Sequence, residues 1–197
     1  MPATTTPDSS PADRHKSWHS RGYLPHCDIP GLIQFVTFRL GDSLPSEVTA
    51  RLLAEKPADN QRSDRLEELL HAGHGHCWLA RDDITALVQD ALLHFDGQRY
   101  QLLAWCVMPN HVHVLIETRE GYPLGEVVHS WKSFTAKQIN QRLSRSGVMW
   151  AADYYDRYIR NDAHLQAAID YIEGNPVKAG LAKRPDEWRF SSAAVRL

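Results

Sequence analysis

The alternation of polar and hydrophobic residues is most regular over residues 107–117. One side of the expected strand carries His111, His113, Leu115 and Glu117, and the other carries Val112, Val114 and Ile116. This two-residue period is typical of a half-buried β-strand. The turn residues Pro109 and Asn110 come just before it, so we expect a hairpin with the apolar run at residues 100–108. The two histidines then point in the same direction.

The remaining segments complete an α+β pattern. Dense β-branched and aromatic residues predict a strand at residues 32–40, and residues 149–160 are expected to be extended. Apolar residues recur at helical spacing in five segments, 45–53, 65–71, 82–95, 124–139 and 165–172. Ser46, Asp82 and Asn161 or Asp162 are the expected caps, and Asn175-Pro176 is expected to end the last helix. This order predicts an antiparallel β-sheet with its helices packed on one face.

The composition is that of one ordinary domain. The chain has 197 residues, 43% of them hydrophobic and 23% charged, which allows a buried core. Residues 1–26 are rich in Thr, Ser and Pro without apolar periodicity, so we expect a disordered segment followed by a single domain over residues 27–197. No run approaches the ~18 apolar residues of a membrane span. Because the start also lacks an apolar signal segment, we expect a cytoplasmic protein.

The formal net charge of −2 is unevenly distributed. Residues 131–197 carry 11 Lys and Arg against 7 Asp and Glu, whereas residues 1–130 carry 11 against 17. A locally basic half is suited to nucleic acid, although a solvated charged surface explains the charge equally well. Lys132, Lys137 and Arg142 lie around the polar side of the helix expected from residue 124, and they are candidates for DNA phosphate contacts.

Two patterns concern metal ligands. On an extended strand, His111 and His113 lie ~6.6 Å apart along the chain, close enough to bind one divalent ion while leaving coordination positions open. The second pattern is the segment 71–77, in which His71, His74, His76 and Cys77 fall within seven residues. A loop between two helices explains that segment as well, since short motifs of this kind often arise by chance.

A phenol and an amide share one edge of the last expected helix. Tyr171 lies roughly 100° from the middle of its apolar stripe, which is not an ordinary core position. Asn175 follows four residues later on the same side, ~6 Å further along the helix axis. Tyr154, Tyr155 and Tyr158 are rival nucleophiles, but they lie in an aromatic run that is suited to packing.

These two halves together resemble a known family. His111-Val112-His113 on a strand, with residues 171–178 at the end of a downstream helix, is similar to the single-tyrosine HUH transposases. Within them the chain is most similar to the REP-associated tyrosine transposases, with which it shares segments 105–117, 129–134 and 175–181. The resemblance implies a ferredoxin-like HUH fold. It also implies that His111, His113 and Asn175 bind a divalent metal, Mg²⁺ or Mn²⁺, and that Tyr171 is the nucleophile.

The resemblance implies a metal-dependent endonuclease and strand-transferase. Its substrate would be single-stranded or hairpin DNA from hairpin-forming repeats, cut through a 5′-phosphotyrosine that leaves a free 3′-hydroxyl. Lys178, close to the nucleophile, joins the candidate DNA contacts. One alternative is an HUH replication initiator or relaxase, and another is a module that binds structured nucleic acid without cutting it. No membrane partner is expected, and both a monomer and a homodimer are compatible with the sequence.

Overall fold

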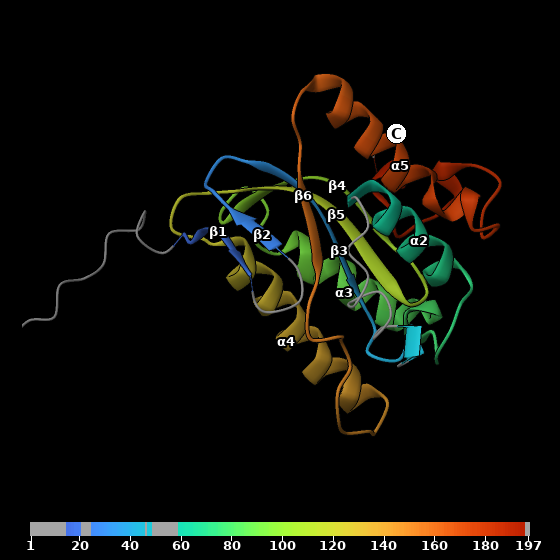
Figure 1. Ribbon diagram of the computed structural model, residues 1–197. Coiled ribbons are helices and arrows are strands. Elements are labelled where there is room, and N and C mark those ends of the chain that lie inside the picture. Colours follow the sequence, from blue (N-terminus) through green and yellow to red (C-terminus); the bar gives the residue numbers. More distant parts are fainter. Residues whose placement is uncertain (1–14, 21–24, 46, 49–58, 196–197) are drawn as a thin grey trace, which may run out of the picture.

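The computed structural model describes residues 15–20, 25–45, 47–48 and 59–195. Its strands are β1 (Ser17–Ser20), β2 (Pro25–Asp28), β3 (Ile33–Arg39), β4 (Tyr100–Val107), β5 (His111–Thr118) and β6 (Tyr155–Tyr158). Its α-helices are α2 (Asp59–His71), α3 (Asp82–Leu93), α4 (Leu124–Arg142) and α5 (Asp162–Lys178). Short 3-10 helices occupy Trp78–Ala80, Pro185–Glu187 and Ser192–Ala194. Figure 1 shows these elements gathered around one sheet.

The main sheet has the strand order β4-β5-β3-β6, and all neighbouring strands are antiparallel. The predicted hairpin of β4 and β5 is present, with Pro109 and Asn110 between the strands. Strand β5 lies in the interior of the sheet between β4 and β3, and the register pairs His113 with Thr37 and His111 with Arg39. Both histidines therefore sit on a strand that is held from two sides.

Helices cover both faces of the sheet. Val36, Phe38, Val112, Val114 and Ile116 pack on one face against apolar residues of α3 and α4. Phe35, Ala104 and Leu115 pack on the opposite face against Ala168 and Ile172 of α5. The predicted α+β antiparallel class is confirmed, but the expectation of helices on one face is corrected. Strand β5 is buried almost throughout, because both of its faces are covered.

The N-terminal boundary also differs from the expectation. Strand β1 and the first half of β2 fall in the stretch expected to be disordered, and the two strands pair antiparallel; residues 1–14 and 21–24 lie outside the described residues. The buried side chain of His26 anchors this hairpin to the rest of the protein, since it contacts Asp156 of β6 and Asp153 just before that strand. Two strands thus begin before residue 27, and one of their residues is bonded to carboxylates far along the chain.

The ends of several helices were predicted imperfectly. Arg81, not Asp82, occupies the cap position of α3, whereas Asn161 caps α5 by accepting a hydrogen bond from the His164 N–H. Helix α5 continues through Pro176 to Lys178. The expected cap Ser46 and most of its short helix lie outside the described residues. No helix in the described part of the chain combines the length and apolar character needed to cross a membrane.

Candidate metal centre and its tyrosine

The two histidines of β5 face one another with their Nε2 atoms. Both side chains are buried, and their Nε2 atoms are 3.1 Å apart. The outer nitrogens have separate partners, because His111 Nδ1 lies 2.7 Å from Asn110 Oδ1 and His113 Nδ1 lies 2.8 Å from Thr37 Oγ1. With hydrogens on Nδ1, both Nε2 lone pairs point inward. Such outer contacts orient the imidazoles of metal sites.

Asn110 fixes the tautomer of His111 through a second hydrogen bond. Its Nδ2 donates to the Leu70 carbonyl at 3.0 Å, so its Oδ1 is the atom that faces His111. Asn110 is buried in the turn between β4 and β5. The turn residue that appeared in the sequence only as a strand boundary therefore joins helix α2 to the histidine pair.

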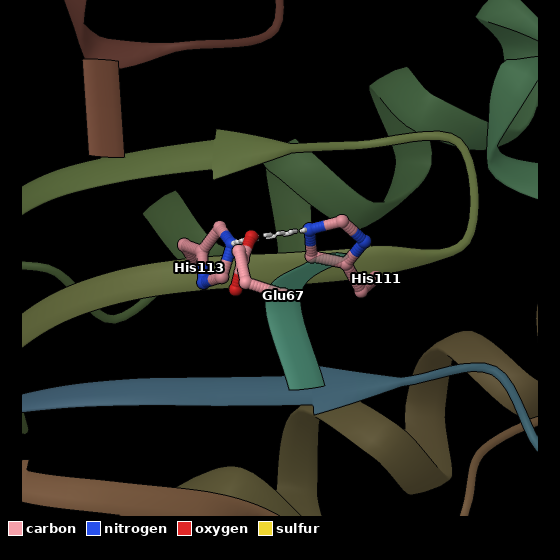
Figure 2. Close-up of side chains that lie close together, drawn as sticks. All are labelled: Glu67, His111 and His113. Carbon is pink, nitrogen blue, oxygen red and sulfur yellow. Dashed lines mark hydrogen bonds and ion pairs between the residues drawn. The ribbon is translucent and has the colours of Figure 1, made fainter. Parts of the chain in front are cut away.

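Helix α2 brings a carboxylate that the sequence analysis missed. Figure 2 shows Glu67 between His111 and His113, with its Oε1 at 2.9 Å from His113 Nε2 and 3.5 Å from His111 Nε2. Among the described His, Cys, Asp and Glu residues, these three form the group whose ligand atoms all lie within 4.8 Å of one another. A signal was present, because Glu67 and His71 directly follow Leu66 and Leu70 and so border the apolar stripe.

The electrostatics of this group favour an ionised carboxylate beside neutral His111. Burial by itself would raise the pKa of Glu67, but attraction to His113 and hydrogen bonds with the surrounding imidazoles lower it below its usual range. Burial lowers the pKa of His111 to about 4. The pKa of His71 is raised, chiefly by its hydrogen bond with Glu67. A negative charge and an uncharged nitrogen ligand thus lie together in the interior.

Asn175 and His71 lie on the outer side of the carboxylate. Asn175 is buried, and its Nδ2 donates to Glu67 Oε1 at 3.0 Å. Its Oδ1 accepts from His71 Nε2 at 2.9 Å. The predicted third ligand therefore belongs to the cluster, but its oxygen faces His71. His71 is the member of the 71–77 segment that reaches the centre, whereas His76 is exposed and bonds Asp42.

Tyr171 lies on the same face of the sheet as the histidines. Its ring centroid is 5.8 Å from that of His113 and 5.8 Å from that of Phe35, edge-on in both cases. It is partly buried. The Lys178 ammonium lies 5.5 Å from the centre of its ring. Since Tyr171 and Asn175 are four residues apart on α5, one helix edge brings both to the centre.

The rival tyrosines are placed differently. Tyr154 is buried, with its ring 4.5 Å from that of His26. Tyr155 pairs with Thr37 and shares the histidine face, but it is two strands from His113, which is about 9.6 Å across a sheet. Tyr158 pairs with Gln34 and alternates to the opposite face. Of these four tyrosines, Tyr171 is therefore the one whose ring contacts His113.

The predicted DNA contacts do not gather at one place. Helix α4, with Lys132, Lys137 and Arg142, covers the sheet face opposite the histidines. The Lys132 ammonium donates to the Ala152 carbonyl, and the Arg142 guanidinium donates to the Asp83 carbonyl. Lys137 is exposed. Of the four predicted cations, Lys178 is the one that lies beside Tyr171.

The donor set fits a divalent ion. In an octahedral site, neighbouring ligands about 2.1 Å from the ion are about 3.0 Å apart. The spacings of 3.1 Å between the two Nε2 atoms and 2.9 Å from His113 to Glu67 are close to this value, and that of 3.5 Å from His111 to Glu67 is about half an ångström longer. Two imidazoles and one carboxylate are also ligands that leave positions open for a substrate. The centre can therefore accept an ion with little rearrangement.

Comparisons with known proteins agree with the sequence resemblance. Residues 81–175 match the family model described as "Transposase IS200 like". A putative REP-associated tyrosine transposase of Haemophilus influenzae is 30% identical over 105 residues, covering 47% of this chain and 58% of the relative. The REP-associated tyrosine transposase of Escherichia coli K12 is 29% identical over 93 residues, covering 47% of this chain and 54% of the relative. The chain thus spans little more than half the length of these curated relatives.

A solved structure supports the fold. A REP-associated tyrosine transposase bound to a REP hairpin matches with a TM-score of 0.54 at 20% sequence identity, over 86% of this chain and 81% of that chain. The match confirms the antiparallel α+β architecture predicted from the sequence.

Proposed function

The match over residues 81–175 relates this chain to the IS200-like transposases, and from that relationship we propose that it cuts and rejoins single-stranded DNA through Tyr171. The substrate is a hairpin-forming repeat with an unpaired flank, as the hairpin bound by the structural relative suggests. The observation that carries the proposal is the position of the Tyr171 ring, 5.8 Å from that of His113.

The chemistry is a transesterification. The Tyr171 hydroxyl loses its proton to solvent, and its oxygen attacks the phosphorus of a phosphodiester. The bond between phosphorus and the 3′-oxygen breaks, and that oxygen takes up a proton to become a 3′-hydroxyl. The protein retains a 5′-phosphotyrosine, which conserves the bond energy. Attack by a 3′-hydroxyl on this ester reverses the steps and rejoins DNA.

The residues around Tyr171 have different roles in this reaction. His111 and His113 would hold a divalent ion, Mg²⁺ or Mn²⁺, together with an oxygen ligand. When bound, it would supply positive charge for a nonbridging phosphate oxygen, whose charge grows in the transition state. Phe35 orients the phenol by edge contact. The Lys178 ammonium favours the phenolate, since the phenol otherwise has a pKa near 10.

The test is covalent capture of DNA. The wild-type protein is incubated with 5′- and 3′-labelled hairpin oligonucleotides taken from inverted repeats near the gene, with Mn²⁺ or Mg²⁺ and with chelator. We expect a protein–DNA adduct that carries the 3′ label, together with a free fragment that ends in a 3′-hydroxyl. Tyr171→Phe abolishes both products, and chelator abolishes them reversibly. Tyr155→Phe is the matched control and retains both.

Two results contradict the proposal. Cleavage by Tyr171→Phe at the wild-type rate assigns the attack to another group. Tight binding of the hairpin by the wild-type protein, without an adduct in either metal, indicates a module that binds structured DNA without cutting it.

A further inference from the structure

We propose that Glu67 is the third protein ligand of the metal centre, and that Asn175, the amide that the family resemblance places there, acts by positioning this carboxylate. The inference rests on the proposed function, since it concerns the same centre. Glu67 comes from α2, which precedes the residues 81–175 that the family model matches. The ligand is therefore supplied by a part of the chain which that match does not cover.

The first argument is the chemistry of the facing atoms. Glu67 Oε1 lies 2.9 Å and 3.5 Å from the Nε2 atoms of His113 and His111. With hydrogens on both Nδ1 atoms, which metal binding through Nε2 requires and which their outer contacts accommodate, both Nε2 lone pairs face this oxygen. Acceptors that face one another in the interior repel unless a cation or a shared proton lies between them. Two imidazoles and one carboxylate form a ligand face that is suited to divalent transition metals.

The second argument is the orientation of the Asn175 amide. Its Nδ2, not its Oδ1, faces Glu67, and its Oδ1 is occupied by the His71 N–H at 2.9 Å. His71 Nε2 also lies 3.4 Å from Glu67 Oε1. Asn175 thus joins two side chains of α2 that are one helical turn apart. Ligating carboxylates usually have hydrogen-bonding partners of this kind, which fix the direction of the oxygen.

Burial gives the third argument. The Glu67 side chain is 4% exposed, and a buried carboxylate is unfavourable unless cationic or hydrogen-bonding partners compensate it. Glu68, the next residue of the same helix, is exposed. Helix α2 therefore separates two adjacent carboxylates, one directed at the histidines and one at solvent. This contrast provides a matched control.

The experiment is a double-mutant cycle on metal affinity. Mn²⁺ binding is measured by electron paramagnetic resonance. All variants are made in the Tyr171→Phe background, so that no DNA cleavage can affect the titration. We expect Glu67→Gln to weaken binding by more than about 100-fold, beyond the range of outer-shell partners, and Asn175→Ala to weaken it by about 10- to 100-fold. Glu68→Gln leaves the affinity unchanged. Because Asn175 acts through Glu67, Asn175→Ala adds little in the Glu67→Gln background.

The alternatives give distinct results. If Asn175 is itself the ligand, Asn175→Ala keeps its full effect in the Glu67→Gln background, and Glu67→Gln alone is mild. Either result overturns the inference, and Tyr171-dependent cleavage by the protein that retains Tyr171, assayed separately, shows that the proposed function still stands. Conversely, Glu67-dependent Mn²⁺ binding without any DNA adduct contradicts the function alone. If Glu67→Gln fails to fold, Glu67→Asp replaces it, and the cycle is read in the same way.

Discussion

The buried His26 imidazole is expected to be protonated and to stabilise the fold through Asp153 and Asp156, by an amount that depends on pH. Its side chain is fully buried, and it bonds Asp153 through Nε2 at 3.0 Å and Asp156 through Nδ1. Burial alone would lower the pKa of this imidazole, but the hydrogen bonds and charges of the two carboxylates raise it from 6.5 to about 9. At about 1.4 kcal/mol per pKa unit, this difference corresponds to about 3 kcal/mol of folding stability.

The sign follows from the direction of the shift. Because the folded pKa lies above the unfolded one, the stabilisation is fully present below pH 6.5 and is lost as the pH rises through about 9. Urea unfolding followed by circular dichroism at pH 6 and pH 10 measures it. Relative to His26→Gln, the wild-type protein should lose about 3 kcal/mol between these two pH values.

An exposed pair provides the control for this measurement. His76 and Asp42 also form a histidine–carboxylate contact, but their side chains are 67% and 40% exposed. His76→Gln should change the free energy of unfolding by less than about 1 kcal/mol at either pH. If His26→Gln and the wild-type protein lose the same stability between pH 6 and pH 10, protonated His26 does not stabilise the fold.

Two further predictions concern the metal centre and the nucleophile. Asn110→Ala removes the contact that fixes the His111 tautomer and should weaken Mn²⁺ binding by about 10- to 100-fold in a paramagnetic resonance titration; an unchanged affinity would show that the tautomer needs no such partner. Lys178→Ala removes the ammonium near the Tyr171 ring and should slow adduct formation by up to about tenfold, less so at high pH where the phenolate forms unaided. Lys183→Ala is the control and should form the adduct at the wild-type rate. If Lys178→Ala slows adduct formation equally at every pH, Lys178 does not act by favouring the phenolate.

The local patterns of the sequence predicted the central strand and the edge of α5 well. Alternation placed His111 and His113 on one face, and four-residue spacing placed Tyr171 and Asn175 on one helix edge. Both relationships are fixed by backbone periodicity within a single element. Periodicity could not predict that this edge of α5 packs against β5, since that packing depends on contacts between segments far apart in the sequence. The family resemblance supplied it.

Glu67 was missed because its role is a long-range property. Its nearest partner on β5 is 46 residues away in the sequence. Within α2 its position beside leucines does not distinguish it from other polar residues. Asn110 was read only as a turn residue, although it is buried and oriented by the Leu70 carbonyl. The end of α5 was misplaced for a related reason: burial of Ile172, Asn175 and Pro176 outweighs the one backbone hydrogen bond that proline removes.

The most direct test of the account identifies the atom that becomes joined to DNA. After reaction of the wild-type protein with hairpin oligonucleotide and Mn²⁺, the adduct is digested with protease and nuclease and is sequenced by tandem mass spectrometry. The account predicts a nucleotide phosphate on the peptide that contains Tyr171, and none on those that contain Tyr154, Tyr155 or Tyr158. A phosphate on any other residue, or cleaved DNA with a free 5′-phosphate and no modified peptide, would contradict it.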